Sequence, residues 1–285
     1  MNINWFPGHM KKAMDQMKQQ LKLIDIIIEL IDARNPISSR NPMLSEIAPE
    51  KPRVVVITKS DLADEKTTAL WEQWFRNEGN KTIRIDPRQR SQINSLIKVT
   101  NDAAKELFEK RKDKGWSSQR LRLMIIGVPN VGKSTLINML AGKKSANVGN
   151  KPGVTKGQQW IKVGNEYDLL DTPGVLWHKF SEDWMGYNLA FTGAIKDDIL
   201  DRETLALKLI EELLFEYSNN LEDRYKIEIT IDDKPIDVME KIASKRGFVS
   251  KGGMVDYNKT ANVVLDEFRK GLFGGISLEK PGQYD

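Results

Sequence analysis

Residues 121–134 read LRLMIIGVPNVGKS, an apolar run that passes directly into the pattern G-x-x-x-x-G-K-S. The run predicts a buried strand, Leu121–Gly127, and the residues after the pattern predict a helix, Ser134–Leu140. In this context the glycines let successive backbone N–H groups face phosphate oxygens, and the helix adds its positive N-terminal end. The stretch therefore predicts a phosphate-binding loop, with contacts from Asn130, Val131, Gly132, Lys133, Ser134 and Thr135.

Two side chains of this loop have separate expected roles. Lys133 neutralises the β- and γ-phosphates, and the Ser134 hydroxyl binds Mg²⁺, a hard cation that bridges them. Asp171-Thr-Pro-Gly174 follows the apolar strand Tyr167–Leu170 about forty residues later. We expect Asp171 to hold Mg²⁺ through water and the Gly174 N–H to bind the γ-phosphate. A turn after a strand explains this second motif alone equally well, but its distance from the loop favours a nucleotide site.

Between these motifs lies Lys143–Lys162, a segment with five lysines, no acidic residue and one Pro-Gly-Val-Thr155 sequence. A loop with a threonine can bind Mg²⁺ and the γ-phosphate before hydrolysis and release them afterwards. We expect Thr155 to be this switch residue. The alternative is an ordinary basic surface loop.

A tetrapeptide near the beginning of the chain, Thr58-Lys59-Ser60-Asp61, predicts the base that is bound. It follows the apolar strand Arg53–Thr58, which places it at the carboxyl edge of a sheet. Asp61 can accept hydrogen bonds from guanine N1–H and the exocyclic amine, whereas adenine offers no such pair. The stem of Lys59 can cover the base, and a solvated loop is the alternative. The expected guanine contacts are Thr58, Lys59, Asp61, Asp86 and Pro87.

The order of secondary-structure elements predicts an α/β fold with a mostly parallel sheet and a smaller helical part. Further strands are expected at Ile24–Ile31, Thr82–Ile85 and Trp160–Val163, with a hairpin turn at Gly164-Asn165 before Glu166–Leu170. Helices are expected at Leu62–Arg76, Gln92–Lys110, Asp201–Tyr217, Val238–Arg246 and Thr260–Gly271, with a connection without periodicity at Arg111–Gln119. The predicted domains are residues 1–178, which bind the nucleotide, and residues 179–285, which are all-α.

Composition restricts the class of protein. The 285 residues include no cysteine and two histidines, so neither a disulfide framework nor a thiolate metal site is expected. The absence of cysteine also suits the cytoplasm. No apolar run reaches membrane-spanning length, and the N-terminus lacks the apolar core of a secretory signal. Residues 1–178 carry a net charge of +10, and residues 179–285 carry −6. A basic half favours a polyanionic partner over a merely solvated surface.

The motifs stand in an unusual order, with the base-reading tetrapeptide before the phosphate loop and Asp171-Thr-Pro-Gly174 last. This order, with Trp5-Phe-Pro-Gly-His-Met10 and Asp32-Ala-Arg-Asn-Pro36, resembles the circularly permuted GTPases of the YlqF/RbgA type, ribosome biogenesis GTPase A. The resemblance spans nearly the whole chain. It implies a cytoplasmic GTPase that uses GTP and Mg²⁺ and binds the precursor of the large ribosomal subunit late in its assembly. It also implies a C-terminal helical domain on ribosomal RNA and hydrolysis that is slow until the subunit stimulates it.

Two departures bear on the site. Thr58 stands where the common base-reading pattern has Asn, and Val175 follows Gly174, where Ras-like proteins have a water-orienting Gln. Poor unassisted hydrolysis is therefore expected. His9, within the resembling motif, is the candidate catalytic residue, ahead of His178. Asn130 matches an asparagine that holds a monovalent cation in potassium-stimulated relatives, so K⁺ is a hypothesis.

The end of the chain supplies the candidate RNA surface. Residues 182–240 carry 6 basic and 16 acidic residues, whereas residues 241–285 carry 8 and 5. The expected RNA contacts are Lys241, Lys245, Arg246, Lys251, Lys259, Arg269 and Lys270, although solvated helix faces explain them equally well. A monomer away from the ribosome is expected. The competing functions are a non-enzymatic GTP-controlled RNA switch, a GTPase of translation or RNA modification, and an ATPase.

Overall fold

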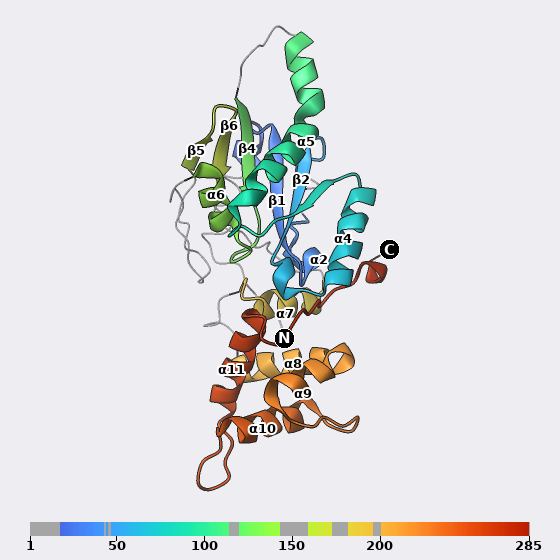
Figure 1. Ribbon diagram of the computed structural model, residues 1–285, viewed down its shortest axis with the longest axis vertical. Helices are drawn as coiled ribbons and strands as arrows, with labels where there is room; N and C mark the ends of the chain where they lie inside the picture. Colours follow the sequence, from blue (N-terminus) through green and yellow to red (C-terminus); the bar gives the residue numbers. More distant parts are fainter. Residues whose placement is uncertain are drawn as a thin grey trace.

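The computed structural model describes residues 18–42, 44, 47–113, 120–142, 159–172, 182–195 and 201–284. A sheet with helices on both faces forms one end of the molecule, and helices α8 to α11 form the other (Figure 1). Helix α7 lies between the two parts. None of the helices in the described ranges is both long and apolar enough to cross a membrane.

The sheet has the strand order β3-β2-β1-β4-β6-β5, in which β5 alone runs antiparallel to its neighbour. Its strands are β1 (Ile26–Asp32), β2 (Arg53–Thr58), β3 (Lys81–Arg84), β4 (Leu121–Ile126), β5 (Gln159–Val163) and β6 (Tyr167–Asp171). The chain leaves the central strand β4 for the β5–β6 side, whereas β1, β2 and β3, which come earlier in the sequence, fill the other side. This arrangement confirms the predicted α/β fold, and it is consistent with a circularly permuted order of motifs.

The predicted helices are present with small changes of boundary. They are α4 (Glu65–Asn77), α5 (Ile93–Asp113), α6 (Lys133–Ala141), α8 (Arg202–Glu216), α10 (Pro235–Arg246) and α11 (Tyr257–Arg269). The prediction of an irregular connection from residue 111 was wrong for Arg111–Asp113, which continue α5. The reason is an ion pair at the last turn, with Arg111 Nη2 2.6 Å from Asp25 Oδ1. The predicted two-residue hairpin turn was also wrong, because Val163 pairs with Tyr167 and leaves three residues in the turn.

Among the helices whose full bounds lie within the described residues, α2 (Pro36–Ser39), α7 (Asp183–Phe191) and α9 (Ser218–Tyr225) were not expected from the sequence. Helix α7 reads DWMGYNLAF, which is apolar on nearly every side and so has no helical period to detect. A helix of this kind is buried between other elements. It contacts α2, α8 and α11 and thereby joins the two parts of the molecule.

Alternate residues of the strands pack on opposite faces of the sheet. Ile26, Ile28 and Leu30 of β1 lie on the face under α5 and α6, and Ile27 and Ile31 lie on the other. The hydrophobic core on the face under α5 and α6 continues without a break through α7 into α8, α10 and α11. Helix α4 covers part of the second face with the fully buried rings of Trp71 and Phe75. The apolar interior is therefore shared between the sheet and the C-terminal helices.

The segment after α11 returns to the sheet and ends beside α4, as the red ribbon in Figure 1 shows. Its most buried polar group is the carboxylate of Glu279, which is 1% exposed. That carboxylate accepts hydrogen bonds from the backbone N–H groups of Ile37 (2.7 Å) and Ser38, from the Ser38 hydroxyl and from the Asn188 amide (3.0 Å). One side chain thus joins α2, α7 and the C-terminal segment.

Glu279 should make stability depend on pH. Burial raises the pKa of Glu279 to about 7, although the four donors favour the charged form. The folded state then holds the Glu279 proton more tightly than the unfolded chain does. The protonated carboxyl therefore contributes fully to the free energy of unfolding at low pH, and this contribution is lost as the pH rises through about 7. Between pH 5 and 8 we expect the free energy of unfolding of the wild type to fall by on the order of 2 kcal/mol relative to that of Glu279→Gln. Denaturant unfolding of both proteins measures this, and parallel pH profiles would contradict it.

Candidate nucleotide site

The predicted phosphate loop lies at the carboxyl edge of the sheet, between the ends of β1 and β6. In open α/β sheets ligands bind at this edge, where the order of strands reverses. Gly127, directly after β4, is required by packing: a Cβ there would lie 2.8 Å from Val131 Cγ1 and 3.0 Å from the Leu30 carbonyl oxygen. The loop is therefore held tightly against β1.

Gly132 provides the second fixed point, at the beginning of α6. Its φ of +104° is one that L side chains rarely adopt, and a Cβ there would lie 3.4 Å from Pro87 Cγ. Thr58 Oγ1 lies 2.7 Å from the Val131 carbonyl oxygen and 3.0 Å from that of Ile31. The phosphate loop thus touches both predicted guanine-binding segments. Thr58, where the common pattern has Asn, joins β2 to the loop.

Lys133 and Asp171 face one another beneath the loop. Lys133 Nζ lies 3.2 Å from Asp171 Oδ1 and also donates to the Thr172 carbonyl oxygen. The lysine side chain is 6% exposed and the aspartate side chain 0%. Burial lowers the pKa of Lys133, and the Asp171 charge opposes that shift. The structure therefore brings together the two residues that the sequence assigned to phosphate and to Mg²⁺.

Asp171 fits a role as a Mg²⁺ ligand. Its second carboxylate oxygen, Oδ2, is buried and has no hydrogen-bond partner among the described residues. A buried carboxylate oxygen without a partner costs free energy unless a cation or water meets it. Oxygen donors are also what Mg²⁺ prefers. Asp171 and the Ser134 hydroxyl, at the beginning of α6, would hold the ion, which would neutralise phosphate charge.

The predicted base-reading turn begins with Lys59, whose backbone is left-handed, with φ of 56°. Its Nζ lies 3.0 Å from Asp32 Oδ2, and Asp32 also accepts two hydrogen bonds from the Arg34 guanidinium, at 2.8 and 3.0 Å. Burial raises the pKa of Asp32, but Arg34 and Lys59 outweigh it and lower the pKa overall. Asp32 and Arg34 thus orient the predicted guanine-covering lysine. Neither residue had an expected role, although their spacing at the end of a buried strand was visible in the sequence.

Asp61 and Asp86, both predicted guanine contacts, share one partner. Arg88 Nη2 lies 2.7 Å from Asp61 Oδ2, and Arg88 Nε lies 2.7 Å from Asp86 Oδ1. Hydrogen bonds from Arg88, with one from Gln89, lower the pKa of Asp86 to about 2. Asp86 is therefore charged at neutral pH in this arrangement, and nothing in the sequence had indicated Arg88 as the common neighbour of the two acids.

We expect Arg88→Ala to strengthen guanine-nucleotide binding, because Asp61 would no longer have to exchange an arginine for the base. Arg88 is 65% exposed, so the effect should be about two- to fivefold, the range for an exposed ion pair. Titration with fluorescent GDP measures it, with exposed Arg90→Ala as the matched control. Weaker binding by Arg88→Ala would mean that Arg88 contacts the nucleotide instead.

Asn130 connects the phosphate loop to the C-terminal part. Its Nδ2 donates to the Gly193 carbonyl oxygen at 2.7 Å, just after α7. Arg269 at the end of α11 donates to the carbonyl oxygens of Phe191 (3.1 Å) and Ala190 (2.9 Å) in the last turn of α7. Asn130 of the phosphate loop and Arg269 of α11 therefore contact the same turn at the end of α7.

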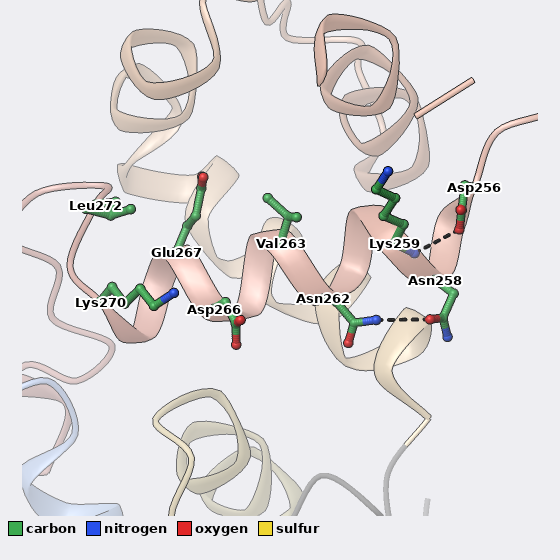
Figure 2. Close-up of a pocket in the computed structure, with 9 residues that line it drawn as sticks. All are labelled: Asp256, Asn258, Lys259, Asn262, Val263, Asp266, Glu267, Lys270 and Leu272. Atoms are coloured by element: carbon green, nitrogen blue, oxygen red, sulfur yellow. Dashed lines mark hydrogen bonds between the residues drawn. The ribbon is translucent and has the colours of Figure 1, made fainter. Parts of the chain in front are cut away.

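The predicted RNA contacts fall into two groups. Lys241 pairs with Asp233 (2.6 Å), Arg246 pairs with Glu267 (2.9 Å), and Arg269 binds α7. Arg246 is nevertheless exposed, and the other exposed members are Lys245, Lys251, Lys259 and Lys270. Lys259 and Lys270 line a groove of about 490 Å³ along α11, beside Asn258 and Asn262 (Figure 2). The exposed lysines are thus spread over α10, the following loop and α11.

Four site predictions lie outside the described residues: His9, Thr155, Gly174 and Val175. His178, the weaker catalytic candidate, lies outside them too.

Known proteins are similar to this chain over nearly its whole length. A family model described as "50S ribosome-binding GTPase" matches residues 122–240. Ribosome biogenesis GTPase A of Priestia megaterium is 46% identical over 99% of this chain and 98% of its own. The protein of that name from Thermotoga maritima is 32% identical over 98% and 95%.

Two solved structures share the fold. A GDP-bound TM YlqF has a TM-score of 0.70 at 25% identity, and it covers 94% of this chain and 99% of its own. The GNP-bound YlqF from T. maritima has a TM-score of 0.67 at 27% identity, covering 95% and 98%. Sequence, fold and the assembly of Thr58, Lys133 and Asp171 at one sheet edge agree. The chain belongs to the ribosome biogenesis GTPase A family.

Proposed function

We propose that the chain is a GTP-hydrolysing assembly factor that binds the precursor of the large ribosomal subunit in a GTP-dependent way and acts late in its maturation. The family supports a GTPase role in ribosome assembly, with GTP and GDP as ligands and Mg²⁺ as the usual ion. The matching family model is described as binding the 50S ribosome, which favours the large subunit as partner.

One observation supports a subunit binding that depends on GTP. The phosphate loop, through Asn130, and helix α11, through Arg269, bind the same turn at the end of α7. A change in the loop therefore acts on the element that holds α11, and α11 carries exposed lysines. Ribosomal RNA is a polyanion, so it would be attracted by the positive charges of Lys245, Lys251, Lys259 and Lys270. The other predicted contacts stabilise the helical part through internal pairs; they are Lys241, Arg246 and Arg269.

Hydrolysis should be slow alone and faster on the subunit. Val175 cannot hydrogen-bond an attacking water, so we assign this role to His9, with Thr155 as the switch residue and the Gly174 N–H on the γ-phosphate. A K⁺ ion beside the phosphates would bind the side-chain oxygen Oδ1 of Asn130, whose amide nitrogen donates to the Gly193 carbonyl oxygen. Equal turnover in sodium and potassium buffers would remove that ion from the proposal.

The division into a nucleotide domain, 1–178, and a helical RNA-binding domain, 179–285, belongs to the same proposal. So do a cytoplasmic location and a monomeric state away from the ribosome. A non-enzymatic GTP-controlled RNA switch is the second candidate, and Val175 favours it. Phosphate release over many turnovers, stimulated by large subunits, separates the two.

Sedimentation with isolated large subunits tests the proposal. Co-sedimentation should be stronger with a non-hydrolysable GTP analogue than with GDP, and it should fall steeply with salt. Charge reversal of both Lys245 and Lys251 should weaken subunit binding without changing GTP affinity. The control is Lys208→Glu on α8, an exposed lysine in the acidic stretch. Association that ignores the nucleotide, or none, would refute the proposal.

A further inference from the structure

The turn that carries Asp61 is packed from behind by residues more than two hundred positions later in the chain. Asp61 lies in the short helix η1 (Ser60–Leu62). The Leu62 carbonyl oxygen accepts a hydrogen bond from the Ile276 N–H at 3.0 Å, and the Ser277 hydroxyl accepts one from the Asp64 N–H at 3.2 Å. These contacts bracket the residues that directly follow Asp61.

Two glycines show how close this packing is. A Cβ on Gly271 would lie 2.6 Å from Leu62 Cδ2, the end of a side chain that can move. A Cβ on Gly275 would lie 2.6 Å from the carbonyl oxygen and 3.1 Å from the carbonyl carbon of Ala63. The second contact is with backbone, so any side chain at Gly275 must displace the turn itself.

The same segment is fixed on its other side by the helical part. Asn220 of α9 donates to the Phe273 carbonyl oxygen at 2.6 Å, and Tyr217 exchanges hydrogen bonds with the backbone of Ser277 at 3.1 and 3.2 Å. Phe273, Ile276 and Ser277 are each less than 5% exposed. The segment is therefore a buried connection and not a loose tail.

A second contact leads from this region to Lys59. The Leu278 N–H donates to the Arg34 carbonyl oxygen at 2.7 Å, and the Arg34 guanidinium lies 5.4 Å from the centre of the Phe268 ring of α11. Arg34 in turn binds Asp32, which holds Lys59. Both base-reading side chains, Lys59 and Asp61, thus rest on elements that the C-terminal part supports.

From these contacts we infer that the segment Gly271–Glu279 is a positioning element of the guanine site, which fixes the turn of Asp61 and links base discrimination to the docking of α11. The inference rests on the guanine site of the proposed function. It assigns Gly275 and Ser277 as positioning residues that act through the Leu62–Asp64 backbone and do not touch the nucleotide.

The test compares GDP with inosine diphosphate, which lacks the exocyclic amine, on the full chain. Gly275→Ala should weaken GDP binding about tenfold and inosine diphosphate binding less, because a displaced Asp61 loses two hydrogen bonds to guanine but one to hypoxanthine. The dissociation constant for inosine diphosphate divided by that for GDP should therefore fall several-fold. Gly282→Ala, whose Cβ would meet nothing within 4 Å, is the matched control and should leave the ratio unchanged.

Ser277→Ala removes only the hydrogen bond to Asp64 and should lower the ratio in the same direction by a smaller factor. If Gly275→Ala does not fold, the result with Ser277→Ala tests the inference instead. An unchanged ratio in the folded variant, or an equal loss for both nucleotides, would overturn the inference. If wild type itself did not prefer GDP to inosine diphosphate, the guanine site would be wrong, and the inference would fail with it.

Discussion

Asp61→Asn should lower the affinity for GTP at least about 100-fold, because an amide replaces one carboxylate oxygen with a donor that faces the donors of guanine. Affinity for xanthosine triphosphate should rise, since xanthine presents a carbonyl oxygen where guanine has its amine. Asp61 is well placed for this result. Its side chain is 43% exposed, it lies in the turn that follows β2, and its carboxylate already accepts a hydrogen bond from Arg88 at 2.7 Å.

Dissociation constants for GTP, xanthosine triphosphate and ATP measure this change of base selectivity. Asp232→Asn, the same substitution in the connection between α9 and α10, should change none of them. If Asp61→Asn kept full GTP affinity, Asp61 would not read the base. Equal binding of GTP and ATP by wild type would instead favour the rival ATPase.

Lys133→Met should have the second large effect, on two separate quantities. Nucleotide affinity should fall at least about 100-fold, since the charge that meets the phosphates is gone. The free energy of unfolding should also fall by about 3 kcal/mol, because Asp171 would remain as a buried carboxylate without its partner. The distance of 3.2 Å and the burial of both side chains make this pair tightly interdependent.

A double variant separates the two effects. Adding Asp171→Asn to Lys133→Met removes the unpaired charge, so stability should return most of the way to wild type while nucleotide affinity stays low. Chemical denaturation and GDP titration measure the two quantities. Recovery of binding together with stability would show that Lys133 acts by holding the fold and not by binding phosphate.

The sequence predicted the sheet and the strand–loop–helix unit around residues 121–141 well, because both depend on local signals. The run Leu121–Ile126 and the glycines after it determine strand, loop and helix within fourteen residues. The strand at Arg53–Thr58 has the predicted bounds, since a short run of β-branched residues favours a strand that is buried on both faces. Lys133 and Asp171 meet as expected, because adjacent parallel strands end at the same edge.

The parts that could not be predicted depend on long-range contacts. Helix α7 has no period because it is buried nearly all round, and Arg269 was assigned to RNA because its sequence does not reveal the carbonyl oxygens of α7 beside it. The role of Arg34 requires Lys59 and Phe268 to be neighbours. Glu279, in a segment of ordinary composition, gives no sign in the sequence that it would be among the most buried acids of the fold.

The return of the C-terminal segment to the base-reading turn also bears on the order in which the molecule can be completed. Asp64 and Ser277 are 213 residues apart, so their contact closes one of the longest loops in the chain, and such contacts form late in folding. During synthesis from the N-terminus, all four nucleotide motifs emerge well before residues 271–279. A chain of that length has every residue to which we assign a nucleotide contact but not the backbone that holds Asp61 in place. We therefore expect full guanine selectivity only when α11 and the segment after it have been made and docked.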